Sequence, residues 1–209
     1  LKQLYESEGM LVVATEDATY FTEDSLEQFS AVVFLNTTGD ILDPIQQADF
    51  ERYIQAGGGF VGIHAATDTE FHWPWYNQLG GAYFDGHPPI QKAELHCFKK
   101  EDPCCKHLPE VWSLEEEWYN FKSINPAIDV LMEIDESSYE GGSNGEKHPM
   151  AWKHHFEGGR AFYSALGHKE GTYQDPLFLR QVLEGTRFAI GNNSLDYSKA
   201  TTFSVPEET

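Results

Sequence analysis

The residues best suited to chemistry begin with a histidine at the end of an apolar run, in the segment GGGFVGIHAATDTE. The run FVGI predicts a buried strand, and His64 follows it directly, with Ala65 and Ala66 next. Small residues are typical of a sharp strand-to-helix turn, because the backbone is crowded there and the residue at the bend is pushed out of the sheet. We therefore expect the turn Gly62–Ala66 to present the His64 imidazole to solvent in a cleft. The alternative is a structural histidine that is hydrogen-bonded inside the turn.

A second histidine lies late in the chain, in the segment LGHKE, where His168 ends an apolar run and Glu170 follows two residues later. Such a pair can supply a base and the carboxylate that orients it. This order, with the turn first and the pair late, resembles that of class I glutamine amidotransferases, which carry a cysteine at the turn. His64 cannot form the thioester of that reaction, so we predict that the protein is not a glutamine amidotransferase. We interpret His64 and His168 as candidate catalytic residues that exchange protons near neutral pH, with Glu170 orienting His168.

Acidic and aromatic side chains suit the recognition of a sugar. Carboxylates accept hydrogen bonds from hydroxyls, and aromatic faces cover the apolar side of a pyranose ring. The segment EEEWYNF (115–121) combines both types, although a solvated charge run is the commoner reading of such acids. His-Pro pairs at 87–88 and 148–149 stiffen their loops. The candidate substrate-binding residues are Asp68, Trp75, His87, Glu117, Tyr119, His148 and Trp152.

The histidines also leave a metal centre open as an alternative. Those on predicted strand ends and loops are His64, His87, His148 and His168. Glu117 or Asp68 would add oxygen ligands. None of the histidines has the close helical spacing of a zinc motif, and the three cysteines fit no zinc spacing. No residue is therefore assigned as a metal ligand, and a divalent metal bound by histidines stays an open alternative.

The elements that must position these residues alternate in the first half of the chain. Strands are predicted at 10–17, 31–36 and 60–64, and a helix at 43–56 begins at the pair Asp43-Pro44. Such alternation predicts a parallel sheet with helices on both faces. Ligands bind such sheets at the carboxyl ends of the strands, which is where His64 lies.

The second half has the pattern of an antiparallel addition. Strands are predicted at 90–98, 127–135, 148–156 and 159–168, the last two as a hairpin, and a closing helix at 175–191. The predicted fold is α/β, with a mostly parallel central sheet and helices on both faces, of the flavodoxin-like or class I glutamine amidotransferase-like type, with an added antiparallel strand region. We expect residues 1–191 to form one domain and 192–209 a C-terminal tail or linker.

Charge and hydropathy narrow the choice of partners. The 209 residues include 14 basic and 34 acidic ones, a formal net charge of −20, and such a surface repels the phosphates of nucleic acids. No apolar run reaches the roughly 18 residues that a membrane-spanning helix needs. We therefore expect neither nucleic-acid binding nor a membrane span.

Six segments together resemble the ThuA-like family. They are GGGFVGIHAATDTE, WPWYNQLGGAYFDGHPPIQ, EEWYNF, DESSYEGG, HPMAW and GGRAFYSALGH…YQDPLF, and they extend from about Ala31 to Gly191. The family is named for trehalose utilisation and is similar in fold to class I glutamine amidotransferases. The resemblance implies a bacterial protein of carbohydrate metabolism with a small-molecule carbohydrate as its partner. Members usually begin with a strand and loop that this chain lacks, so one wall of the cleft is expected to be missing.

Two functional hypotheses follow. In the first, the protein is a hydrolase, lyase or isomerase that acts on a sugar or keto-sugar by histidine acid/base chemistry, with Glu117 binding hydroxyls. In the second, it is a non-catalytic carbohydrate-binding or accessory domain with a degenerate amidotransferase-like site. The tail resembles the segment that precedes further domains in larger bacterial proteins. The resemblance is compatible with a periplasmic or secreted location, and the sequence leaves the cytoplasm open as well.

Overall fold

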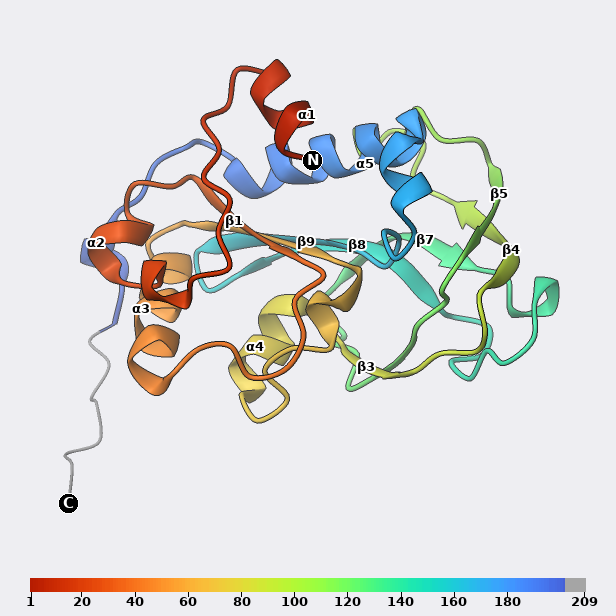
Figure 1. Cartoon of the computed structure of the whole chain (residues 1–209), viewed down its shortest axis with the longest axis horizontal. Helices are drawn as coiled ribbons and strands as arrows, with labels where there is room; N and C mark the ends of the chain where they lie inside the picture. The colour runs from red at the N-terminus through yellow and green to blue at the C-terminus, as the bar shows by residue number, and fades with distance from the viewer. Residues whose placement is uncertain (202–209) are drawn as a thin grey trace.

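The computed structural model describes residues 1–201 and shows a seven-stranded sheet with helices on both faces (Figure 1). In spatial order the strands are β1 (Ala31–Leu35), β2 (Gly59–Ile63), β9 (Gly159–Ser164), β8 (Pro149–Phe156), β7 (Asp129–Ile134), β4 (Gln91–Cys97) and β5 (Val111–Glu116). The strands β1, β2 and β9 pair in parallel, and each later pair in this order is antiparallel. The predicted α/β class, with an added antiparallel region, is confirmed.

The helices cover the sheet in two layers. Helices α1 (Lys2–Ser7) and α5 (Pro176–Ile190) lie on one face, and α3 (Pro44–Gln55) and α4 (Pro74–Gly80) lie on the other (Figure 1). The short helix α2 (Glu23–Leu26) packs beside α3. Both long helices begin where the sequence predicts, because the carboxylates of Asp43 and Asp175 accept hydrogen bonds from N–H groups of the first turn.

Short elements connect these layers. A second, two-stranded antiparallel sheet pairs β3 (Tyr83–Gly86) with β6 (Asn120–Lys122). The 3-10 helices are η1 (Ala18–Tyr20), η2 (His64–Thr67), η3 (Glu136–Ser138), η4 (Glu170–Gln174) and η5 (Tyr197–Lys199). Two of them start at candidate catalytic residues: η2 starts at His64 and η4 starts at Glu170.

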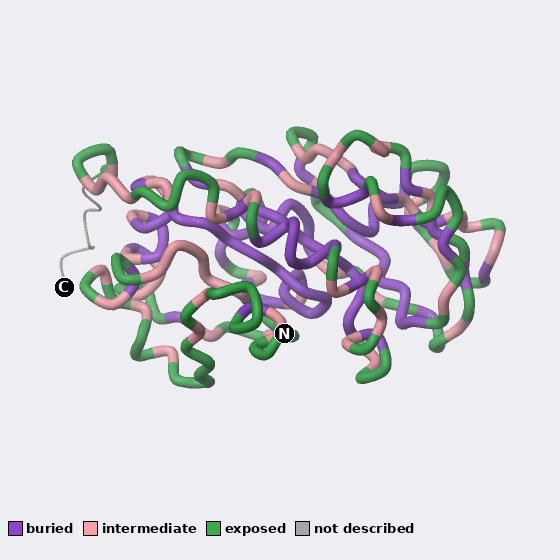
Figure 2. The backbone as a smooth tube through the Cα atoms, turned by 90° about the horizontal axis from the view of Figure 1, so that it is seen from above, coloured by how far each residue is buried: buried purple, intermediate pink, exposed green. Residues whose placement is uncertain are grey.

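The core lies between the sheet and its helices (Figure 2). All five residues of β2 are buried, as expected for a central parallel strand. The Phe34 ring contacts those of Phe60 and Tyr76, with centroids 5.3 and 5.7 Å apart, which ties β1 to β2 and to α4. Burial of such a ring stabilises a fold by roughly 1.5–3 kcal/mol. The three cysteines are buried free thiols.

The strand predicted at 10–17 is wrong. The segment forms no ladder, and the sheet ends at β1. Met10 and Val12 pack against the core, whereas Leu11 is fully exposed and Val13 is half-exposed. The apolar run therefore reflects one-sided packing of an extended segment, without the hydrogen-bonded neighbour that a strand requires.

The predicted tail begins by folding back on the domain. The Asp196 N–H donates to the Ala56 carbonyl at 2.8 Å, and the Thr201 N–H donates to Oε1 of Gln55 at 2.8 Å. Residues 202–209 of that tail lie outside the described residues. Within residues 1–201, no helix combines the length and apolar character needed to cross a bilayer.

Candidate functional site

The turn after β2 has the geometry that its sequence predicts. His64 has a φ of 49°, in the left-handed region that residues with a Cβ seldom adopt. The Tyr163 hydroxyl donates to the His64 carbonyl at 2.6 Å and so anchors the bend from β9. A Cβ at Gly62 would lie 2.9 Å from the Tyr163 ring and 3.2 Å from Cβ of Ala66, so a glycine fits there best. The strained backbone at His64 is thus held by its neighbours on two strands.

The expectation that this turn presents His64 to solvent is wrong, since the residue is only 2% exposed. The Tyr119 ring covers the imidazole, with the two ring centroids 4.1 Å apart. Nδ1 of His64 lies 2.8 Å from the Ala165 carbonyl, which can only accept, so Nδ1 carries the proton. Burial lowers the pKa of His64, although the Ala165 hydrogen bond and the Glu117 carboxylate oppose this shift. The neutral form with a bare Nε2 is favoured.

Three imidazoles converge on the carboxylate of Glu117, which directly follows β5. Oε2 lies 3.2 Å from Nε2 of His64 and 3.3 Å from Nδ1 of His168. Oε1 lies 3.4 Å from Nδ1 of His87. The His64 and His168 rings are 5.3 Å apart between centroids, so the structure brings these two residues together. The cluster is therefore assembled from segments that follow β2, β3, β5 and β9.

Access to this cluster is from the His168 and His87 side. Their side chains are 42% and 39% exposed, whereas that of Glu117 is 11% exposed. Nδ1 of His87 also lies 3.0 Å from the Pro88 carbonyl, so this nitrogen is the protonated one. An open groove of about 470 Å³ is lined by Pro88, Pro89, Gln91, Glu140 and Gly141, and no residue of the cluster is among its lining residues. A ligand could reach the cluster from solvent without displacing the core.

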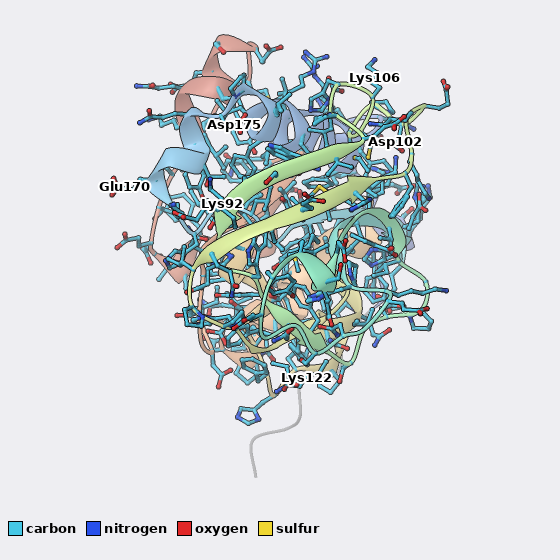
Figure 3. All side chains as sticks on the ribbon, turned by 90° about the vertical axis from the view of Figure 1, so that its right-hand side faces the viewer. Lys92, Asp102, Lys106, Lys122, Glu170 and Asp175 are labelled. Atoms are coloured by element: carbon cyan, nitrogen blue, oxygen red, sulfur yellow. The ribbon has the colours of Figure 1, made fainter. Side chains whose placement is uncertain are left out.

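The carboxylate beside His168 is Glu117, and Glu170 does not reach the ring. Glu170 starts η4 and points outward from the surface (Figure 3), and its side chain forms no hydrogen bond or ion pair within residues 1–201. The carboxylate that does contact the His168 ring, that of Glu117, lies 51 positions before His168 in the chain. The 3-10 helix that begins at Glu170 turns this side chain away from the strand end.

Glu116 is a supporting residue that the sequence does not reveal. It is fully buried, and its carboxylate accepts hydrogen bonds from the N–H groups of Gly167 and Lys169 and from the Thr172 hydroxyl, at 3.1, 3.3 and 2.5 Å. These groups flank His168. The run of three glutamates gave no sign of this role, because strand alternation turns Glu115 outward and Glu116 inward.

Two of the predicted substrate-binding residues border the cluster besides His87 and Glu117. Asp68 directly follows η2, and burial raises the pKa of its carboxyl. Tyr119 packs against His64, and burial raises the pKa of its phenol. Within residues 1–201, neither the Asp68 carboxylate nor the Tyr119 hydroxyl has a hydrogen-bond partner. Both are polar groups that could bind a hydroxyl.

The other three predicted substrate-binding residues do not face the cluster. His148 is fully buried, with Nε2 2.8 Å from the Tyr119 carbonyl and Nδ1 2.8 Å from Glu136. Trp152 is fully buried against Tyr163, and its indole N–H donates to the Gly80 carbonyl. The Trp75 indole donates to Glu157 in the turn before β9, at the amino ends of the parallel strands. His148 fixes the backbone of Tyr119, and the two tryptophans are part of the packing.

Three donor atoms of the cluster could hold a metal ion. Nε2 of His64, a carboxylate oxygen of Glu117 and Nδ1 of His168 all lie within 4.8 Å of one another. A second group with this property, Glu94, His96 and Asp135, lies on β4 and just after β7 and is more exposed. The open alternative of a histidine-bound divalent metal thus has a specific location.

Solved structures support the fold. A ThuA-like protein from Bacteroides uniformis is 25% identical, with a TM-score of 0.78 over 94% of this chain and 84% of that one. A ThuA-like protein from Parabacteroides merdae is 23% identical, with a TM-score of 0.72 over 99% and 86%. A β-galactosidase from Bacillus circulans shares the fold over 75% of this chain and 22% of its own, at 16% identity and a TM-score of 0.51.

The family follows from the sequence. No significant match was found among curated proteins. The model of the family ThuA, described as trehalose utilisation, matches residues 1–189. This match confirms the predicted family and supports a carbohydrate-related role in general. The chain belongs to the ThuA family.

Proposed function

We propose that the protein processes a sugar or keto-sugar by proton transfer at the cluster of His64, His87, Glu117 and His168. The observation that carries the proposal is the convergence of three imidazoles on one poorly exposed carboxylate, two of them open to solvent. Proton transfer near neutral pH needs such groups, and the family name points to a carbohydrate.

His168 is the proposed general acid or base. Its Nδ1 faces Glu117, which orients the ring, and its exposed side chain leaves Nε2 for the substrate. The carboxylate of Glu117 also stabilises a positive charge on the ring during transfer. We assign buried His64 no direct contact with the substrate, because the Tyr119 ring covers its imidazole. Asp68 and the Tyr119 hydroxyl are proposed to bind sugar hydroxyls.

The arrangement suits a keto-sugar because a C–H bond beside a carbonyl is weakly acidic. One imidazole can remove that proton while the other protonates an oxygen, and both groups are present here in His168 and His87. Isomerisation of a keto-sugar, and elimination of a group β to its carbonyl, both need this pair of steps. A positioned acid or base typically contributes about 10²- to 10⁴-fold in rate.

A direct test follows solvent exchange and products by NMR. The protein is incubated in D₂O with trehalose, glucose and keto derivatives of each. We expect deuterium to enter at the carbon beside the carbonyl, followed by an isomerised or cleaved product. His168→Gln and Glu117→Gln should slow this about 10²- to 10⁴-fold. Glu170→Gln is the matched control, because that exposed carboxylate touches neither ring. Equal rates in all three variants would contradict the assignment.

A non-catalytic carbohydrate-binding domain is the second candidate, and the burial of His64 favours it. In that case the cluster would bind a sugar without exchange or turnover. Calorimetry with the same sugars separates the two functions. Saturable binding that Glu117→Gln abolishes, with no exchange in D₂O, would support the binding domain over the enzyme.

A further inference from the structure

We propose that His64, Glu117 and His168 bind one divalent transition-metal ion of the zinc class. The inference deepens the proposed function, since it rests on the same cluster as the sugar site, but it does not depend on proton transfer. Three independent features of the cluster carry it: the tautomer of His64, the distances between the donor atoms, and the exposure of one side.

The first feature is the direction of the His64 lone pair. Because Nδ1 donates to the Ala165 carbonyl at 2.8 Å, the neutral ring has its lone pair on Nε2. That lone pair points at Oε2 of Glu117, 3.2 Å away, so two acceptors face each other. A positive centre between them relieves the repulsion. A histidine that donates one N–H to a backbone carbonyl is oriented as metal-ligating histidines usually are.

The second feature is the spacing of the donors. Ligands about 2.0–2.2 Å from a tetrahedral zinc ion lie about 3.4 Å from each other. Oε2 of Glu117 lies 3.2 Å from Nε2 of His64 and 3.3 Å from Nδ1 of His168. All three donors lie within 4.8 Å of one another, so small side-chain rotations would place an ion between them. Two imidazoles and one carboxylate are also the ligand set of several catalytic zinc sites.

The third feature is an open fourth position. Catalytic zinc sites keep one position for water or substrate, and here the cluster opens to solvent beside His168, whose side chain is 42% exposed. That position would take a hydroxyl or carbonyl oxygen of the sugar and polarise it. With the ion bound, Nδ1 of His168 is a ligand, and His87 is the exposed imidazole that remains for proton transfer. Nδ1 of His87 donates to the Pro88 carbonyl, so we do not include it among the ligands.

The test measures metal binding without any activity. The full chain is stripped with a chelator and titrated with Zn²⁺ and Co²⁺ by calorimetry, and the bound metal is counted by mass spectrometry. We expect one ion per chain and the visible absorption of tetrahedral Co²⁺. Mg²⁺ should not compete, because it prefers six oxygen ligands. His168→Gln and Glu117→Gln should weaken binding by more than the roughly 10- to 100-fold that loss of a ligand-orienting partner costs.

The second group of donors supplies the matched control. His96→Gln removes a histidine from the group of Glu94, His96 and Asp135 and leaves the cluster intact, so affinity should not change. The proposal is overturned if the stripped chain binds neither ion saturably, or if only His96→Gln lowers the affinity. If the metal-free protein still exchanges deuterium into the sugar, the proposed function holds and the metal is not needed for it. If the protein binds one Zn²⁺ ion per chain but shows no exchange or turnover, the metal-site proposal holds and the proposed enzymatic function is contradicted.

Discussion

At the scale of single residues, the site depends on two neighbouring glutamates with different tasks. Glu117 faces the imidazoles, whereas Glu116 holds the backbone on either side of His168. The Glu116 carboxylate can serve its three donors because carboxylate oxygens only accept hydrogen bonds. The segment EEE looks like a surface charge run, and only the pairing of β5 at the sheet edge gives each glutamate its direction.

The first prediction concerns Glu116→Gln. The glutamine would turn an N–H₂ group toward backbone or hydroxyl donors, leaving buried polar groups unpaired, so we expect a loss of about 1–3 kcal/mol in the free energy of unfolding. Urea denaturation measures it. Glu115→Gln is the neighbouring control, because the Glu115 side chain is exposed and forms an ion pair with Lys169 at the surface. Equal stability of the two variants would mean that Glu116 does not hold the His168 loop.

The sequence revealed part of this site for a physical reason. His64 and His168 each end a predicted strand, and the pairing of β2 with β9 sets the ends of those two strands side by side. Glu117 as their shared partner could not be predicted, because it arrives from β5 at the far edge of the sheet. The burial of His64 depends on the Tyr119 ring, whose place is fixed by the His148 contact to its backbone. Such contacts are set by tertiary packing and have no local sequence signal.

At the scale of elements, the sharp turn between β2 and η2 is the feature that the sequence predicted best. Its signal is local, since Gly62, Ala65 and Ala66 are small where the backbone is crowded. The same local reasoning failed at residues 10–17, where an apolar run met no neighbouring strand. Patterns that arise from local crowding can be read from a sequence, whereas strand formation also needs a partner.

The second prediction is that Gly62→Ala destabilises the fold. The new Cβ would press on the Tyr163 ring at 2.9 Å, and this ring anchors the His64 carbonyl. Overpacking of this kind costs about 1–3 kcal/mol in unfolding free energy. Gly171→Ala is the control, because a Cβ there meets nothing within 4 Å. Thermal unfolding followed by circular dichroism compares the two, and a Gly62→Ala midpoint no lower than that of Gly171→Ala would contradict the packing argument.

At the scale of the whole molecule, stability depends on titratable groups that folding buries. His148 and His154 are buried, and burial lowers the pKa of each imidazole. Below the ordinary histidine pKa of about 6.5, the unfolded chain then binds more protons than the folded one. The stabilising contribution of these two histidines is therefore fully present above about pH 6.5 and is lost as the pH falls below it. Burial raises the pKa of Glu51 to about 7, and this contribution has the opposite sign, since it is lost as the pH rises toward 7.

The last prediction isolates one of these imidazoles. Nε2 of His154 lies 3.0 Å from the Gln78 carbonyl, and a glutamine could donate the same hydrogen bond without titrating. In the parent protein, the free energy of unfolding falls as the pH is lowered from the ordinary histidine pKa toward the lowered pKa of His154. In the His154→Gln variant this fall should be less steep, by up to about 1.4 kcal/mol per pH unit, which is the value for one proton. Urea denaturation between pH 5 and 8, in the presence of a chelator, measures the slope, and Glu51 contributes equally to both proteins. His72→Gln removes an exposed imidazole and should leave the slope unchanged. If both variants keep the slope of the parent protein, His154 does not enter the fold as a neutral ring.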